Sequence, residues 1–250
     1  MDIVTEKNTK QYDTHAKEWQ AEMDSNLGHK YLEKPAMEQE LPKDLTDKAV
    51  LSIGVGSGDE LLEILKRHPR KVVGIDVSSK LLDIARARFP DVEFQKMEMT
   101  DLHFPDDSFD LIYSSLTFHY AKDWDILLSG TYRVLKENGE LLFSTHHPVY
   151  WGSKASTGNK YTNERGVTVT EYTAVLPADI EITYYNHENE DAIREAVKHA
   201  GFEIKHSFAP LVIDVPINEI PENNIVKYQK LKIKNEEMPL FFIVKAIKKQ

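Results

Sequence analysis

The most constraining feature of this chain is an apolar segment that leads directly into alternating glycines, Val50-Leu51-Ser52-Ile53-Gly54-Val55-Gly56-Ser57-Gly58. Because glycine permits both a tight turn and the close approach of a ligand, the segment predicts a strand that ends in a binding loop. A second apolar segment ends in Asp76, 18 residues after Gly58. A carboxylate there suits the two hydroxyls of a ribose, so the pair predicts a nucleoside site at the carboxyl edge of a parallel sheet.

Composition limits the partners and the compartment. Acidic residues outnumber basic ones by 41 to 31, which gives a net charge of −10 and disfavours binding to nucleic acid. The chain has no cysteine, its first residues lack the basic and apolar blocks of a signal peptide, and no apolar run approaches the ~20 residues of a membrane span. We therefore expect a single cytoplasmic domain over residues 1–250, a monomer or homodimer, with no membrane partner and no metal.

From residue 49 onward, apolar strand-like segments alternate with helical ones. This alternation predicts an α/β fold in which a mostly parallel sheet is covered by helices on both faces. Ser78 and Ser79 can cap one helix, and Asn138-Gly139 is typical of a helix stop. The expected strands are 49–53, 71–76, 92–97, 109–115, 139–145, 202–208 and 239–246, and the expected helices are 59–68, 79–88, 123–136 and 190–200.

Three further segments lie outside this alternation. Residues 11–23 carry apolar side chains at helical spacing, and 31–41 form a second amphipathic stretch, so both are expected to be helical. Residues 148–185 interrupt the pattern, with one short β-like stretch at 167–172, and an interruption of this length is usually functional. The alternating Lys and Glu of 227–237 predict a solvated surface.

The spacing of the glycines narrows the choice of nucleoside. A dinucleotide fingerprint needs glycines at relative positions 1, 3 and 6, but here the sixth position is Asp59. The loop also lacks the Gly-Lys-Ser/Thr ending of a triphosphate site, and Asp59 and Glu60 at the start of the next helix would repel a phosphate. A phosphate-free, cationic cofactor fits best, and S-adenosylmethionine meets both conditions.

With these motifs in place, the chain resembles the class I S-adenosylmethionine-dependent methyltransferases of the broad small-molecule group, over about residues 48–146. The matching motifs are the glycine loop at 53–58, the ribose acid Asp76, and the segment 98–120. The resemblance implies a Rossmann-like seven-stranded sheet of order 3-2-1-4-5-7-6 with the last strand antiparallel. It also implies a cap from residues 1–45 and an inserted lid at 148–187.

The resemblance further implies which residues bind the cofactor and its product, S-adenosylhomocysteine. The expected cofactor contacts are Gly54, Gly56, Ser57, Gly58, Asp76, Val77, Glu98, Met99, Ser115 and Leu116. One position departs from the family: Ser52 stands where an acid usually supports the amino-acid end of the ligand. Asp59 or Glu60 is a possible replacement for that acid.

The aromatic and histidine residues supply candidates for the methyl-acceptor side, although each of them singly also suits plain packing. We expect Tyr12, Trp19, His119, His146 and Trp151 to line the substrate site. His119 and His146 are the candidate catalytic bases for an in-line displacement. His146 and His147 point to opposite faces of a strand, which argues against a shared metal ion.

The predicted function is methyl transfer to a small molecule. Two alternatives stay open at this stage: a protein that binds the cofactor without transferring a methyl group, and an RNA or protein methyltransferase.

Overall fold

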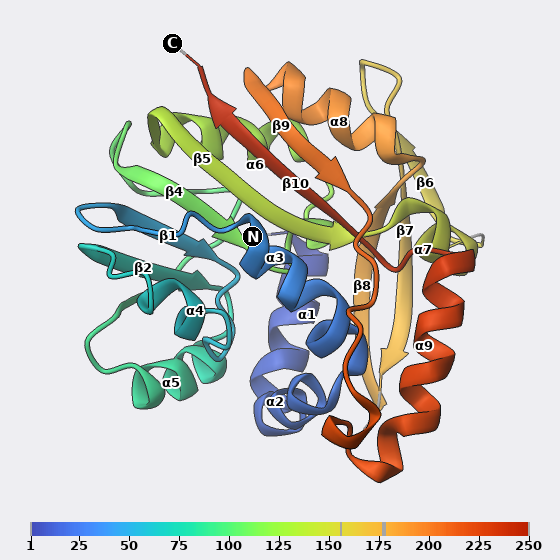
Figure 1. The fold of residues 1–250 in the computed structure, drawn as a ribbon. Coiled ribbons are helices and arrows are strands. Elements are labelled where there is room, and N and C mark those ends of the chain that lie inside the picture. The colour runs from blue at the N-terminus through green and yellow to red at the C-terminus, as the bar shows by residue number, and fades with distance from the viewer. Residues whose placement is uncertain (1, 156, 177–178, 250) are drawn as a thin grey trace.

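A seven-stranded sheet forms the centre of the computed structural model, which describes residues 2–155, 157–176 and 179–249 (Figure 1). Its order is β3-β2-β1-β4-β5-β10-β9, and β10 runs antiparallel to both of its neighbours. With β9 and β10 as the sixth and seventh strands, this confirms the expected order. The strands are β1 Ala49–Ile53, β2 Lys71–Asp76, β3 Glu93–Lys96, β4 Phe109–Ser114, β5 Leu135–His146, β9 Phe202–Phe208 and β10 Phe241–Lys248.

Helices cover both faces of the sheet. The central strand β1 carries apolar side chains on both sides, and each side is buried against helices. Leu51 and Ile53 pack in a core with residues of α6 and α8, whereas Val50 packs with residues of α3, α4 and α5. Ser78 accepts a hydrogen bond from the backbone N–H of Leu81 and so caps α5, as expected. These helices are α3 Lys34–Glu40, α4 Leu61–Leu65, α5 Ser79–Arg88, α6 Trp124–Val134 and α8 Glu190–His199.

The remaining elements lie beyond the arrowheads of β1, β2 and β5 (Figure 1). The interruption at 148–185 folds into α7 Pro148–Lys154 and a small antiparallel sheet of β6 Asn159–Thr162, β7 Thr168–Leu176 and β8 Ile180–His187. The N-terminal elements are α1 Ile3–Thr14, α2 Ala16–Ser25 and a π-helical turn at His29–Glu33. Asn8 joins the two parts: its amide nitrogen donates to the Thr183 carbonyl oxygen and its Oδ1 accepts from the Thr183 N–H.

Four local expectations differ from the structure. The helix expected over 11–23 is divided at His15, which ends α1 and precedes α2. The helix expected over 59–68 is confined to α4, and α6 stops at Val134. Consequently β5 starts at Leu135 instead of 139, and Asn138 inside it adopts φ 58°.

The Lys/Glu-rich segment forms α9 Ile225–Glu237, which is mostly exposed as expected but buries two side chains. Tyr228 packs edge-on against Tyr31, with ring centroids 5.4 Å apart, and Asn235 bonds the Pro210 carbonyl oxygen. Among the described helices, none is long and apolar enough to cross a membrane.

Candidate active site

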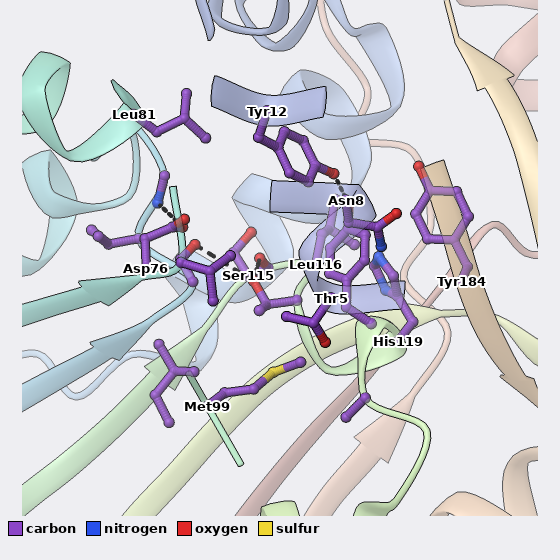
Figure 2. A pocket seen from close by; sticks show the side chains of 18 of the residues that line it. Thr5, Asn8, Tyr12, Asp76, Leu81, Met99, Ser115, Leu116, His119 and Tyr184 are labelled. Atoms are coloured by element: carbon purple, nitrogen blue, oxygen red, sulfur yellow. Dashed lines mark hydrogen bonds between the residues drawn. The ribbon is translucent and has the colours of Figure 1, made fainter. Parts of the chain in front are cut away.

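A cavity of about 600 Å³ opens at the carboxyl edge of the central sheet. Asp76 lies at one end, Tyr12, His119 and Tyr184 lie at the other, and Ser115 and Leu116 lie between them (Figure 2). The walls come from the sheet, from α1 and α2, and from the 148–187 segment. Substrate sites in open α/β sheets form at this edge, so one continuous cavity places the candidate cofactor and acceptor regions side by side.

The glycine loop borders the cavity directly through Gly54, Gly56 and Ser57. Gly54 has φ +71°, and a Cβ built on it would lie 2.1 Å from Thr117 Oγ1. Gly56 has φ +52° and no neighbour within 4 Å of such a Cβ, so its open side leaves room for a ligand. Gly58 departs from the expectation, because it does not line the cavity and a Cβ there would meet Phe89 at 2.9 Å.

Asp76 ends β2 and fastens the glycine loop to it. Its Oδ2 accepts from the N–H of Gly56 at 2.9 Å, and its Oδ1 accepts from the N–H of Ser78 at 2.8 Å. Burial raises the pKa of Asp76, although the hydrogen bonds from Ser78, Gly56 and Val77 oppose the shift. Each carboxylate oxygen can accept more than one hydrogen bond. Asp76 can therefore hold the loop and still accept from a bound diol, with Val77 beside it in the wall.

Glu98 and Met99 follow β3 and line the same end of the cavity, together with Met97. The N–H of Met97 donates to the Asp76 carbonyl oxygen at 3.0 Å, which ties the ends of β2 and β3 together. The Glu98 carbonyl oxygen accepts from the N–H of Asp101 in a tight turn. This turn brings two methionine side chains and one carboxylate to the wall, a combination that suits a flat ring with polar edges.

Ser115 and Leu116 occupy the middle of the cavity and are positioned by a buried acid. Glu33 is 0% exposed, and its Oε1 accepts from Ser115 Oγ at 2.9 Å and from Ser144 Oγ at 2.5 Å. Ser144 Oγ in turn accepts from the N–H of Leu116, which has φ 48°. The backbone after β4 is thus held by Glu33, a residue of the N-terminal segment. His29, one turn earlier, lies with its Nε2 3.4 Å from Glu33 Oε2 and lines the cavity.

Aromatic rings form the far end of the cavity. Tyr12 packs edge-on against Trp19, with ring centroids 4.9 Å apart, and its hydroxyl hydrogen bonds that of Tyr120. Tyr120 lies 5.2 Å from Tyr184, centroid to centroid. Burial raises the pKa of Tyr12, Tyr120 and Tyr184 well above the ordinary value, so these hydroxyls stay neutral.

Two histidines and Trp151 stack at this aromatic end. The rings of His119 and His146 lie 3.6 Å apart and nearly parallel, and Trp151 stacks on the other face of His146 at 3.8 Å. His146 Nδ1 shares a hydrogen bond with the Tyr172 hydroxyl at 3.1 Å. Burial lowers the pKa of His119 to about 3, and burial together with the nearby His119 lowers that of His146 well below the ordinary value. Both rings are therefore neutral at physiological pH.

His147 faces away from His146, as the alternation of side chains along a strand predicted. Its Nε2 lies 2.9 Å from Glu190 Oε1, and its Nδ1 accepts from the N–H of Val149 at the start of α7. Within the part of the chain that the structure describes, no group of three His, Cys, Asp or Glu side chains converges as a metal site would require.

Carboxylates dominate the charged groups of the cavity wall. Lys122 is the one lysine or arginine among the described lining residues, and its Nζ lies 3.4 Å from the centroid of the Tyr161 ring. The lining acids are Asp2, Glu22, Asp59, Glu60, Asp76, Glu98, Asp101 and Asp123. The field inside the cavity therefore favours neutral or cationic ligands over anions.

Comparison with known proteins identifies this arrangement. The family model described as a methyltransferase domain matches residues 51–143. The demethylmenaquinone methyltransferase of Thermotoga maritima is 31% identical over 183 residues, which cover 70% of this chain and 78% of that protein. The chain belongs to the S-adenosylmethionine-dependent methyltransferases. Its methyl donor is S-adenosylmethionine, and the donor leaves as S-adenosylhomocysteine.

A solved structure extends the similarity over more of the chain, and a second curated relative matches a shorter part of it. An S-adenosylmethionine-dependent methyltransferase structure from Mesorhizobium loti is 25% identical, with a TM-score of 0.67, over 90% of this chain and 99% of that one. An uncharacterised Haemophilus influenzae protein is 36% identical over 128 residues, which cover 47% of this chain. The match spans about half the length of the Haemophilus protein, at 49%.

The structure brings together every expected site residue except Gly58, and it adds several that the sequence did not reveal. Tyr120 and Tyr184 join the aromatic end, and His29 joins the middle of the cavity. Glu33 and Glu60 are acids whose importance lies in what they contact after folding. Of these two acids, only Glu60 could be singled out from the sequence. It lies two residues after Gly58, and it is one of the two possible replacements for the acid expected at Ser52.

Proposed function

We propose that this methyltransferase transfers a methyl group, by in-line displacement, to a small uncharged or cationic acceptor bound at the aromatic end of the cavity. The observation that carries the proposal is the single cavity that runs from Asp76 to His119. In this arrangement residues 1–45 and 148–187 act as the cap over the acceptor. Figure 2 shows the two ends with Ser115 and Leu116 between them.

The donor would occupy the half of the cavity that Asp76 defines. The ribose hydroxyls donate to Asp76, the methionine part lies along Gly54, Gly56 and Ser57, and the adenine lies among Val77, Glu98 and Met99, all of them in the cavity wall. Ser115 and Leu116 lie next to the donor's reacting end. Gly58 supports the turn from behind instead of contacting the donor.

Catalysis in this proposal rests mainly on positioning. A sulfonium methyl group is already activated, so the acceptor nucleophile attacks it in line and the thioether leaves. Holding the two partners aligned in a dry cavity lowers the barrier by ~7–11 kcal/mol. The buried aromatic end supplies such an environment, and no residue needs to form a covalent intermediate.

The two stacked histidines contribute hydrogen bonds from neutral rings. His119 Nδ1 accepts from the backbone N–H of His146 at 3.4 Å, so the proton of a neutral His119 ring belongs on Nε2. His119 is then a hydrogen-bond donor to an acceptor oxygen. His146 keeps the role of candidate proton acceptor, with its Nδ1 at the Tyr172 hydroxyl and Nε2 remaining.

The charge of the cavity supports the choice of acceptor. A lysine or arginine favours an anionic acceptor, and the one among the described lining residues, Lys122, lies over the Tyr161 ring. The Thermotoga relative is named for a quinone acceptor, and a neutral ring of that kind suits stacked aromatic walls. An RNA acceptor would have to bind next to eight acidic side chains, most of them charged, which disfavours it.

A labelling experiment tests this function. The protein is incubated with methyl-labelled S-adenosylmethionine and a metabolite extract that has been separated into anionic, neutral and cationic fractions. Label is expected in a neutral or cationic product, and Trp151→Ala should raise the KM for that acceptor while leaving the Kd for S-adenosylhomocysteine unchanged. Label confined to the anionic fraction would refute the proposed acceptor class, whereas cofactor binding without any labelled product would refute catalysis.

A further inference from the structure

Two neighbouring acids follow the glycine loop, but they differ in their partners. Asp59 forms an ion pair with Arg88, whose Nη1 lies 2.6 Å from Asp59 Oδ1. Glu60 forms no ion pair with any lysine, arginine or histidine of residues 2–155, 157–176 and 179–249. Its Oε1 accepts from Ser52 Oγ at 2.9 Å, and its side chain lines the cavity. Glu60 is thus a carboxyl group without a countercharge, at the wall of the donor site.

Ser52 explains how Glu60 is held. Ser52 lies in β1, is 0% exposed and does not reach the cavity. The resemblance to the class I methyltransferases implies an acid at this position. In this chain the short hydroxyl donates to Glu60 instead, so the carboxyl group reaches the cavity from residue 60, just before α4.

The surroundings of Glu60 hold little positive charge. Burial raises its pKa to about 8, and the negative charges of Asp59 and Glu33 add to the shift, while hydrogen bonds from its own backbone N–H and from Ser52 oppose it. Tyr113 of β4 interacts with Glu60 and has its own pKa raised well above the ordinary value, so it stays neutral. Two neighbouring side chains have other partners: Arg88 binds Asp59, and His29 lies against Glu33.

We propose that Glu60, oriented by Ser52, binds the ammonium group at the methionine end of the donor and so replaces the acid that relatives carry at the position of Ser52. This inference rests on the proposed placement of the donor along Gly54 and Gly56. The ammonium group of the cofactor would supply the positive charge that Glu60 lacks in the protein. Of the two lining acids that follow the glycine loop, Asp59 is paired with Arg88 and Glu60 has no cationic partner among the described residues.

The proposal implies a proton exchange that accompanies donor binding. In the free protein below about pH 8 the Glu60 carboxyl group is mostly protonated. When the ammonium binds, the carboxyl O–H bond breaks, the carboxylate pairs with the ammonium, and the proton passes to solvent. Affinity therefore rises with pH, by up to about tenfold per unit, and levels off near pH 8, where the ligand's own α-amino group begins to lose its proton.

Calorimetry with S-adenosylhomocysteine measures this exchange. Titrations at several pH values from about 5.5 to 7.5, each in two buffers of different ionisation enthalpy, give the affinity and the number of protons released. The wild-type protein should release close to one proton at the acidic end. An analogue of S-adenosylhomocysteine that lacks the amino group should bind without this release, and this arm requires no variant.

Matched variants assign the proton to Glu60. Glu60→Gln should bind S-adenosylhomocysteine at least tenfold more weakly at pH 7.5 and with no pH dependence. Asp59→Asn is the neighbouring control and should keep the pH dependence, because Asp59 is paired with Arg88. His29→Gln should keep it as well, which separates Glu60 from the histidine that also lines the cavity.

Two results would overturn the inference. One is a Glu60→Gln protein with wild-type affinity and proton release, and the other is equal proton release with the amino-free analogue. Either result leaves the methyltransferase assignment intact, because S-adenosylhomocysteine still binds. Absence of binding by the wild-type protein would contradict the proposed donor site itself, so the two failures are distinguishable.

Discussion

Replacement of Asp76 by asparagine is the most direct probe of the donor site. In the structure each Asp76 oxygen accepts one backbone hydrogen bond, from Gly56 and from Ser78. Asparagine preserves the shape and one acceptor oxygen, but its amide group replaces the other oxygen with a donor. Donor binding then loses one charged hydrogen bond to the ribose and weakens the second, because the remaining acceptor is neutral.

The expected magnitude follows from these bonds. A hydrogen bond to a charged group contributes about 1.5–3 kcal/mol and a neutral one about 0.5–1.5 kcal/mol. Asp76→Asn should therefore weaken S-adenosylhomocysteine binding by about 2–3 kcal/mol, which is roughly 30-fold to 150-fold in Kd. Asp76→Ala also leaves the N–H groups of Gly56 and Ser78 without their acceptor. Besides weakening binding, it should therefore lower the free energy of unfolding by about 1–3 kcal/mol.

A double-mutant cycle separates the ribose contact from loop damage. Calorimetry compares S-adenosylhomocysteine with its 2′,3′-dideoxy analogue, on the wild-type protein and on Asp76→Asn. The wild-type protein should lose affinity for the analogue, whereas the variant should bind both ligands almost equally. If the two losses simply add, Asp76 does not contact the ribose and the reasoning from its geometry is wrong.

Three further outcomes are expected. Gly54→Ala should lower the free energy of unfolding in urea by about 2–4 kcal/mol, because alanine is strained at φ +71° and its Cβ meets Thr117, and by more than Gly56→Ala, which has open space. Burial lowers the pKa of His187 from 6.5 to about 4, so the unfolded chain takes up the proton first as pH falls below 6.5. His187 alone should lower the free energy of unfolding by about 2 kcal/mol between pH 7 and pH 5, and His187→Phe should remove that part of the loss. Asn8→Ala should speed hydrogen exchange in α1 and β8 together, since Asn8 makes two hydrogen bonds to the β8 backbone; unchanged exchange would mean that other contacts hold the two elements.

The central sheet was predictable because its signals are local. Apolar strands and the cap at Ser78 lie within a few residues of the features they specify, whereas Asn138-Gly139 did not mark the end of a helix, because α6 already stops at Val134. The start of β5 was not predictable from its own sequence, because it is set by the pairing of Leu135 with Phe109 of β4, ahead of the polar residues 136–138. The β-like stretch expected at 167–172 is confirmed as part of β7, but β6 and β8 were not predicted, since their pairing with β7 depends on residues outside their own segments.

The same distinction applies to the site. Gly54 and Asp76 were predicted from their residue type and from their spacing along the chain. Glu33 has no such signal, because its role depends on its hydrogen bonds with Ser115 and Ser144 in the folded structure. No local pattern marks an acid that will be 0% exposed. Gly58 differs in the opposite direction: it belongs to the motif, but it does not line the cavity, and a Cβ there would meet Phe89.

The docking of α1 on β8 has a consequence for how the chain is made. Asn8 and its partner Thr183 are 175 positions apart, and Glu33 is 111 positions from Ser144. During synthesis from the N-terminus, the first helix leaves the ribosome long before the strand that receives it exists. Helix α1 is thus among the last elements to dock, and until then the carboxyl edge of the nascent sheet stays open. Contacts of such long range favour slow folding, and a chain halted before β8 would present Tyr12 and Trp19 to the surrounding water.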